Sequence, residues 1–248
     1  WHPQSRRRYC VTSSAANLIP VKNDPRPAQT RYLKSVKPPS TNMLKRGSNN
    51  KKLGDKVTVK MWKGMTMYSL SLEERATCPT SCEQWENCYG DNMPFAHRFD
   101  HTHAKFIEYL EAQLQTLNEK HKEGFVVRLH VLGDFYADHY IIQWQKWLNQ
   151  FENLHVFGYT HIPCETPSGQ LISHINSYYK ERFRIRFSDD FDTAYSAHVF
   201  KEPMTVHISI DQRGKASIVC PEQTGETASC TTCGYCWASE KPVVFIEH

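Results

Sequence analysis

The chain has 248 residues, of which 40% are hydrophobic, 23% charged and 12% aromatic. This composition suits a globular protein with a substantial core and excludes collagen-like, coiled-coil and wholly disordered chains. No apolar run approaches the roughly 18–20 residues that span a bilayer, and no signal peptide is evident, so we expect a cytoplasmic protein without membrane contact.

The net charge of +4 conceals an asymmetry along the chain. Residues 1–56 carry 13 Lys and Arg against two acids, whereas the remaining 192 residues carry 17 basic and 24 acidic groups. We therefore expect a basic, loosely structured arm over residues 1–57, in front of one folded domain over residues 58–248. Such an arm suits DNA or RNA, because neutralising phosphates releases counterions. The alternative is a solubilising extension or a tail that binds another protein.

Seven of the nine cysteines fall into two short clusters, and this pattern favours metal ligands in a reducing compartment over a disulfide framework. The first cluster, Cys78, Cys82 and Cys88, has the spacing C-x3-C-x5-C. Three thiolates can hold three corners of an iron–sulfur cube or three positions on zinc, which leaves one position open for a small molecule. The alternative is a zinc site closed by a histidine downstream, from the set His97, His101 and His103.

The body of the chain alternates helical and strand patterns. Apolar spacings of three and four predict helices over residues 103–122, around 140–151 and over 169–181. Strands are predicted over residues 125–132, 155–161, 183–187 and 205–211, with shorter ones near 216–219 and 243–247. The crossovers are long enough for parallel pairing, so the predicted class is α/β.

Polar residues occupy one face of three predicted strands, and apolar residues occupy the other face. Val127, Leu129 and Val131 form the apolar face of the first of these strands. A doubly wound open sheet would be apolar on both faces. We therefore expect a partial or complete (β/α) barrel of TIM-barrel type, with helices outside and a polar cavity inside; an open sheet with one solvated face is the alternative. The side chains expected to line the cavity and bind an anionic substrate are Arg128, His130, Arg184, Arg186 and His207.

In barrels, functional residues lie at the carboxyl ends of the strands. Polar residues follow four predicted strands here, and Asp134, Asp189 and Asp211 are the candidate catalytic residues. Gly133 would let the backbone approach a ligand closely. The candidate cofactor-binding residues are Gly133, Asp134, Tyr159 and Ser188.

A second cluster lies near the C-terminus, within residues 220–237. Cys220, Cys230, Cys233 and Cys236 supply four thiolates, which suffice for zinc or for a fully ligated iron–sulfur centre. A complete set of four indicates a structural or electron-transfer site.

The order of strand, three-cysteine loop ending in Cys-Tyr, helix, strand, Gly-Asp and helix resembles the radical S-adenosylmethionine enzymes. The resemblance implies that Cys78, Cys82 and Cys88 bind a [4Fe–4S] cluster whose fourth iron holds S-adenosylmethionine, and that Gly133-Asp134 contacts the amino group of that cofactor. It also implies an electron donor as a partner and a second, auxiliary cluster at the C-terminal cysteines. The loop has three residues more than the usual C-x3-C-x2-C spacing, and Gly-Asp-Phe replaces Gly-Gly-Glu. Residues 68–238 are also similar to a group of phage and plasmid proteins, a resemblance that implies no activity.

We therefore expect an iron–sulfur, radical S-adenosylmethionine-type enzyme that acts on a nucleotide or nucleic acid. One alternative is a zinc-containing barrel transglycosylase that exchanges a base in DNA or tRNA through an aspartate nucleophile, Asp134 or Asp189. Another is a non-enzymatic protein that binds nucleic acid and uses two zinc sites as staples.

Overall fold

The computed structural model describes residues 36–59, 61–93, 96–188, 195–200 and 217–246. These residues form an eight-stranded sheet in the order β2-β3-β5-β6-β7-β8-β10-β9, in which every neighbouring pair is parallel except β2 and β3. The predicted α/β class is confirmed. The strands of this sheet are β2 (Lys45–Arg46), β3 (Thr66–Ser69), β5 (Phe125–Leu129), β6 (Leu154–Thr160), β7 (Phe183–Ser188), β8 (Ser196–Phe200), β9 (Ile218–Val219) and β10 (Val243–Ile246). A separate parallel pair consists of β1 (Val36–Lys37) and β4 (Arg98–Phe99).

The three helices predicted from apolar spacing are present as α1 (Phe106–Lys120), α2 (Asp138–Gln150) and α3 (Pro167–Tyr178). The α3 helix begins where the Thr166 side chain accepts a hydrogen bond from the Gly169 N–H, with proline at the first helical position. The shorter helices are η1 (Gly47–Asn49), η2 (Tyr89–Asn92), α4 (Cys230–Cys233) and α5 (Tyr235–Ala238). No helix in the described part of the chain combines the length and apolar character that crossing a membrane requires.

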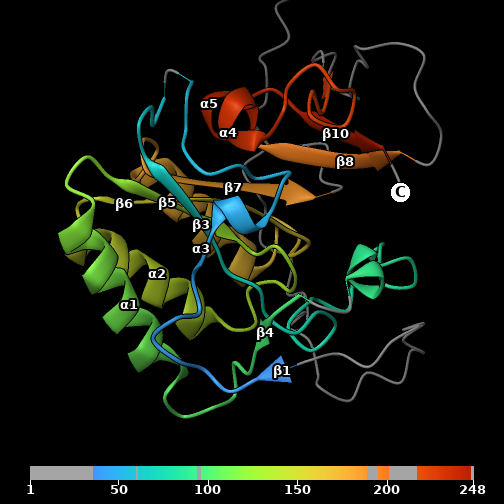
Figure 1. The fold of residues 1–248 in the computed structure, drawn as a ribbon. Helices are drawn as coiled ribbons and strands as arrows, with labels where there is room; N and C mark the ends of the chain where they lie inside the picture. The colour runs from blue at the N-terminus through green and yellow to red at the C-terminus, as the bar shows by residue number, and fades with distance from the viewer. Residues whose placement is uncertain (1–35, 60, 94–95, 189–194, 201–216, 247–248) are drawn as a thin grey trace, which may run out of the picture.

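The two faces of the sheet are covered by different parts of the chain (Figure 1). Helices α1, α2 and α3 cover one face, where Val127, Val156 and Ile185 belong to the larger apolar core. A smaller core lies on the opposite face, which we call the inner face. There Phe157 and Trp237 are fully buried, so the segment that contains α4 and α5 covers the sheet opposite the helices.

The sheet is open among the described residues, because its order ends at β2 on one side and at β9 on the other. A complete barrel is therefore not formed by these residues. The C-terminal segment nevertheless reaches back to the region around β2 and β3. The backbone N–H of Cys230 donates to Lys52 O at 2.7 Å, and that of Thr231 donates to Leu53 O at 3.0 Å. The segment around Cys230 thus links the two ends of the sheet through these backbone hydrogen bonds, without pairing between β2 and β9.

Part of the predicted arm belongs to the folded body. Met43 is fully buried and Leu44 is 2% exposed, and both lie in the larger core. A few apolar residues in a basic segment suffice to anchor it, so residues 43 and 44 pack with the body, and the boundary at residue 57 stays a prediction. Residues 1–35 lie outside the described residues, as do Asp189, His207, Asp211 and the predicted strand over 205–211.

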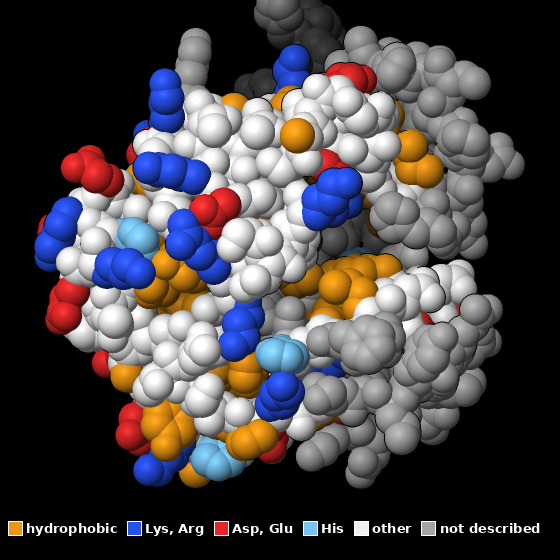
Figure 2. All heavy atoms as spheres, in the orientation of Figure 1, with side chains coloured by type: hydrophobic (Ala, Val, Ile, Leu, Met, Phe, Trp, Pro, Cys, Tyr) orange, Lys and Arg blue, Asp and Glu red, His pale blue; other side chains and the backbone are white. Residues whose placement is uncertain are grey.

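On the face shown in Figure 2, basic and acidic side chains are interspersed rather than gathered by sign.

The alternation of faces holds along β5 and then changes. Arg128, Arg184 and Arg186 follow the inner-face pattern, opposite the residues that pack under the helices. His130 does not, because β5 ends at Leu129 and the chain turns. Its Nε2 lies 3.1 Å from the hydroxyl oxygen of Tyr140 on α2, and its ring packs edge-on against Phe135. His130 therefore lies among aromatic side chains beside α2, apart from the inner-face pattern of Arg128, and its role as a substrate contact stays a prediction.

Candidate functional site

The first cysteine loop leaves the carboxyl end of β3 beside the segment that leaves β5. Backbone hydrogen bonds continue the pairing beyond the strands: Leu70 N–H donates to Arg128 O at 3.2 Å, and Leu72 N–H donates to Leu132 O at 2.9 Å. This extension carries residues 73–93 to the edge where Gly133 and Asp134 lie. The loop ends in η2.

The three cysteines of the loop are free thiols with partly exposed side chains. Burial of the sulfur, and then the nearby Asp134 and Cys82, raise the pKa of Cys78 well above its usual value. Burial also raises the pKa of Cys88, to about 11. These two thiols are protonated at neutral pH, so a metal that binds here would displace their protons.

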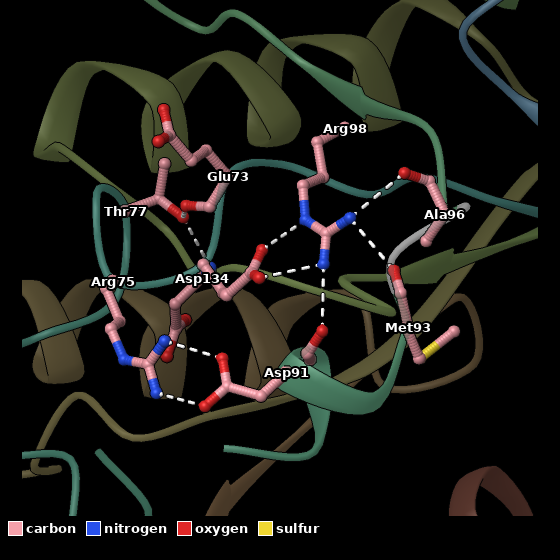
Figure 3. Close-up of polar contacts among 10 residues, drawn as sticks. Glu73, Arg75, Thr77, Asp91, Met93, Ala96, Arg98 and Asp134 are labelled. Carbon is pink, nitrogen blue, oxygen red and sulfur yellow. Dashed lines mark hydrogen bonds and ion pairs between the residues drawn. The ribbon is translucent and has the colours of Figure 1, made fainter. Parts of the chain in front are cut away.

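A buried ion pair between Arg98 and Glu74 fixes the part of the loop that follows Cys88 (Figure 3). Arg98 and Glu74 are each 1% exposed, and two hydrogen bonds of 2.5 and 2.8 Å join them. The remaining N–H groups of Arg98 donate to the carbonyl oxygens of Gly90, Met93 and Ala96 at 3.0–3.1 Å. One guanidinium thus holds five acceptors, three of them on the backbone that follows Cys88.

A second ion pair, between Arg75 and Asp91, ties the start of the loop to its end. Arg75 donates to both carboxylate oxygens of Asp91 at 2.7 Å and to the carbonyl oxygen of Trp85 at 2.9 and 3.0 Å. Arg75 also has φ of 63°, which is uncommon for a residue other than glycine and persists only where surrounding contacts fix it. Sequence reasoning missed these two pairs, which we call the arginine frame. Their only signal is the run Glu73-Glu74-Arg75 before the loop, which resembles a solvated turn.

Asp134 connects the loop to the neighbouring strand ends. Its side chain is 2% exposed, and its two carboxylate oxygens accept hydrogen bonds from the N–H groups of Phe135 at 2.7 Å and His161 at 2.8 Å. Its own N–H donates to Thr77 Oγ1 at 3.1 Å. Burial raises the pKa of Asp134, and the bonds from its donors oppose that rise.

Gly133 has φ of 83°, and an added Cβ would lie 2.5 Å from Thr77 Oγ1 and 2.8 Å from Leu72 Cβ. The close approach that its sequence position suggests is therefore to the cysteine loop of the protein itself. Gly133 and Asp134 position that loop. Ser188, a further predicted cofactor contact, ends β7 and is partly exposed.

The second cysteine set lies on the inner face. A capping box starts α4: the Ser229 side chain accepts a hydrogen bond from the backbone of Thr232, and the Thr232 side chain accepts one from the backbone of Ser229. Gly234, with φ of 68°, separates α4 from α5. Cys220 and Cys236 are buried, while Cys230 and Cys233 are partly exposed.

Tyr159, predicted as a cofactor contact, lies against this second set. Its hydroxyl donates a hydrogen bond to Cys236 Sγ at 2.8 Å. Burial raises the pKa of Tyr159 well above its usual value, so the hydroxyl keeps its proton and remains a donor. Burial likewise raises the pKa of Cys236, while Arg186, Tyr159 and Arg128 act to lower it.

The inner-face arginines differ in how many donors they have left. Arg186, a predicted substrate contact, is fully buried and uses all five N–H groups on backbone carbonyl oxygens, so in this conformation it has no N–H left for a ligand. Its acceptors are the carbonyls of Cys236, Ser196, Lys241, Tyr235 and Ser239.

Arg128 and Arg184 retain donors. The Arg128 guanidinium lies 4.5 Å from the Tyr159 ring centre and 5.5 Å from that of Phe157, and it forms no ion pair with a described residue. Arg184 donates from Nη1 to the Tyr195 hydroxyl, while its buried Nε has no hydrogen-bond partner within the described ranges. These two arginines remain candidates for an anionic ligand.

Both donor sets fit a thiolate-bound metal by their chemistry, since each groups free cysteines around one short segment. Within the described ranges, no three His, Cys, Asp or Glu side chains converge as closely as bound metal ligands do. Metal binding would therefore require the thiols to rotate inward.

The family model described as GP88, gene product 88, matches residues 42–239. No curated protein and no solved structure matches the chain.

Proposed function

Because the chain belongs to the gene product 88 family, whose description names no activity, its function is argued from its own residues, and we propose an iron–sulfur enzyme of the radical S-adenosylmethionine type. The observation that carries the proposal is the loop of three free thiols at the carboxyl edge of a parallel sheet. Cys78 of this loop lies within electrostatic reach of Cys82, Cys88 and Asp134. Three thiolates from one loop leave one iron of a cube open to a ligand.

The residues of the chain would bind, orient and shield the reacting groups. Cys78, Cys82 and Cys88 would hold the cluster, and the arginine frame would keep the loop in place. When bound, the cluster and S-adenosylmethionine supply one-electron and hydrogen-abstraction chemistry. A carboxylate has about four acceptor positions, so Asp134 can accept a hydrogen bond from an ammonium group in addition to its backbone donors.

The proposed substrate is anionic, a nucleotide or nucleic acid. Arg128 and Arg184 lie on the inner face with donors to spare, as described above. Residues 1–56 add 13 Lys and Arg against two acids, a balance suited to phosphates. An external electron donor would complete the system.

The transglycosylase alternative needs an aspartate that is free to attack. Asp134 does not favour it, because the carboxylate is buried and both oxygens accept backbone hydrogen bonds. The second alternative, a nucleic-acid-binding protein stapled by zinc, uses the same cysteines and differs in the metal that the first loop holds.

Metal analysis of the anaerobically purified full chain tests the proposal. We expect about four irons or more per chain, with matching sulfide and a brown chromophore. Under a chemical reductant, the protein should release methionine from S-adenosylmethionine. The Cys82→Ala variant should lose this activity and the irons of the first loop, whereas Cys164→Ala, a buried cysteine outside both sets, should retain them. Zinc alone, with no iron after anaerobic reconstitution, would overturn the proposal in favour of the zinc-stapled alternative.

A further inference from the structure

Three neighbouring strands each direct one side chain toward Cys236. Tyr159 on β6 donates its hydroxyl hydrogen to the sulfur at 2.8 Å. Arg186, its register partner on β7, donates from Nε to the Cys236 carbonyl oxygen at 2.9 Å. Arg128 on β5 lies over the face of the Tyr159 ring at 4.5 Å. The convergence joins residues that are 77 and 50 positions apart from Cys236 in the sequence.

These contacts suit a sulfur that carries negative charge. A hydroxyl that donates to sulfur stabilises a thiolate more than a thiol, because charge-assisted hydrogen bonds are the stronger ones. A cation over the phenol ring draws electron density from the ring and makes the hydroxyl a better donor. Arg186 adds a full positive charge beside the Cys236 peptide in a fully buried position.

The charges of the proposed site balance. Four thiolates around a divalent metal ion leave a net charge of −2, and burying such a charge without compensation is costly. Arg128 and Arg186 carry two positive charges, and neither forms an ion pair with a carboxylate in the described part of the chain. If the four cysteines stayed neutral thiols, no carboxylate paired with either arginine among the described residues would offset these positive charges.

We propose that Cys220, Cys230, Cys233 and Cys236 bind one divalent metal ion as four thiolates, and that Arg128, Tyr159 and Arg186 offset the resulting charge at Cys236. Four metal–sulfur bonds form, and the four thiol protons go to solvent. Hydrogen-bonded neighbours of metal ligands contribute to affinity, and losing one lowers it about 10–100-fold. The inference goes beyond the proposed radical chemistry and does not depend on it.

Cobalt(II) is the test metal, because its thiolate complexes absorb in the near ultraviolet. Anaerobic titration would use the full chain with Cys78, Cys82 and Cys88 replaced by Ala, so that the C-terminal set alone is measured. We expect one cobalt per chain, four protons released, and a Tyr159→Phe variant that binds about 10–100-fold more weakly. Arg128→Met should also weaken binding, and Arg128→Lys should restore most of it.

The matched control is Tyr68→Phe. The Tyr68 hydroxyl lies 2.9 Å from His121 Nε2, so the control removes a similar hydrogen bond in the larger core. Cobalt affinity should not change in this variant. The inference would be overturned if Tyr159→Phe bound cobalt as tightly as the same protein with Tyr159 in place. It would also be overturned if the full chain with the three first-loop cysteines replaced bound no stoichiometric cobalt. An iron-free first loop would overturn only the proposed enzyme function, so the two failures are distinguishable.

Discussion

The arginine frame supports a quantitative prediction about the first cysteine loop. Replacing Arg98 with Met keeps a long apolar stem but removes all five hydrogen bonds of the guanidinium. Glu74 then loses its buried partner, and the carbonyl oxygens of Gly90, Met93 and Ala96 lose the donors that Arg98 supplied. Since both charged side chains are 1% exposed, water does not replace these contacts unless the loop opens.

Breaking a buried pair by removing one partner typically costs about 3–5 kcal/mol. That is a large share of the 5–15 kcal/mol or so by which domains are stable. The pair of Arg46 and Asp55 provides a matched control, because its two hydrogen bonds are of similar length, 2.6 and 2.8 Å, while its side chains are 55% and 38% exposed. We expect Arg46→Met to change stability barely measurably, because solvent screens the exposed pair.

Urea unfolding of chelator-treated protein would measure both losses, and hydrogen exchange over residues 74–98 would locate them. Arg98→Met should unfold at lower urea and exchange faster in the loop than in α1. Equal losses in Arg98→Met and Arg46→Met would refute the reasoning, since burial is the difference between the two pairs. Fast exchange of the loop in the unmodified protein would refute it as well.

Three further outcomes follow from other parts of the structure. Burial lowers the pKa of the His130 side chain to about 3, whereas this pKa is roughly 6.5 in the unfolded chain. Below pH 6.5 the unfolded chain therefore binds a proton that the folded protein does not, and acid favours unfolding. Between pH 7.5 and 5, urea titrations should show that His130→Gln loses about 2 kcal/mol less free energy of unfolding than the unmodified protein. Gly54→Ala should lower the melting temperature, because Gly54 has φ of 77° and the new Cβ would lie 2.1 Å from Thr231 Oγ1 and 2.6 Å from Ser229 Oγ; an unchanged melting temperature would contradict this packing. Deleting residues 1–35, which leaves Met43 and Leu44 in place, should weaken DNA or RNA binding and flatten its salt dependence; unchanged binding would argue against a nucleic-acid-binding arm.

The elements that the sequence predicted well are those whose signal is local. The α1 helix buries Phe106, Leu110, Leu114 and Leu117, the residues whose spacing predicted it. Strands β5 and β7 likewise follow the predicted alternation of apolar and polar residues, and β6 follows a mostly apolar run. The short strand β8 was missed, because Ser196 and His198 are buried polar residues and disguise the pattern. Burial of a polar side chain depends on partners that a local pattern does not show.

The roles of individual arginines could not be predicted, because their partners are distant in the chain. Arg128 and Arg186 show the same strand pattern, yet Arg186 spends every donor on carbonyls from residues up to 55 positions away, and Arg128 lies over aromatic rings. Arg75 and Arg98 carried no site signal, although they shape the loop that the cysteine spacing identified. Cysteine spacing selects ligands, whereas the geometry that positions them comes from tertiary contacts.

The two cysteine sets are held by different forces, and this difference predicts how metal binding couples to folding. The first loop, residues 73–93, buries one large apolar side chain, Trp85, which belongs to neither apolar core, so the arginine frame would form the loop before any metal binds. Three members of the second set, Cys230, Cys233 and Cys236, lie on helices of four residues, which are too short to be stable alone, and Cys220 follows β9. Those helices depend on Trp237, whose ring stacks on Trp62 at 5.4 Å. Metal loss from the second set should therefore loosen the inner-face core, while metal loss from the first should leave the fold intact.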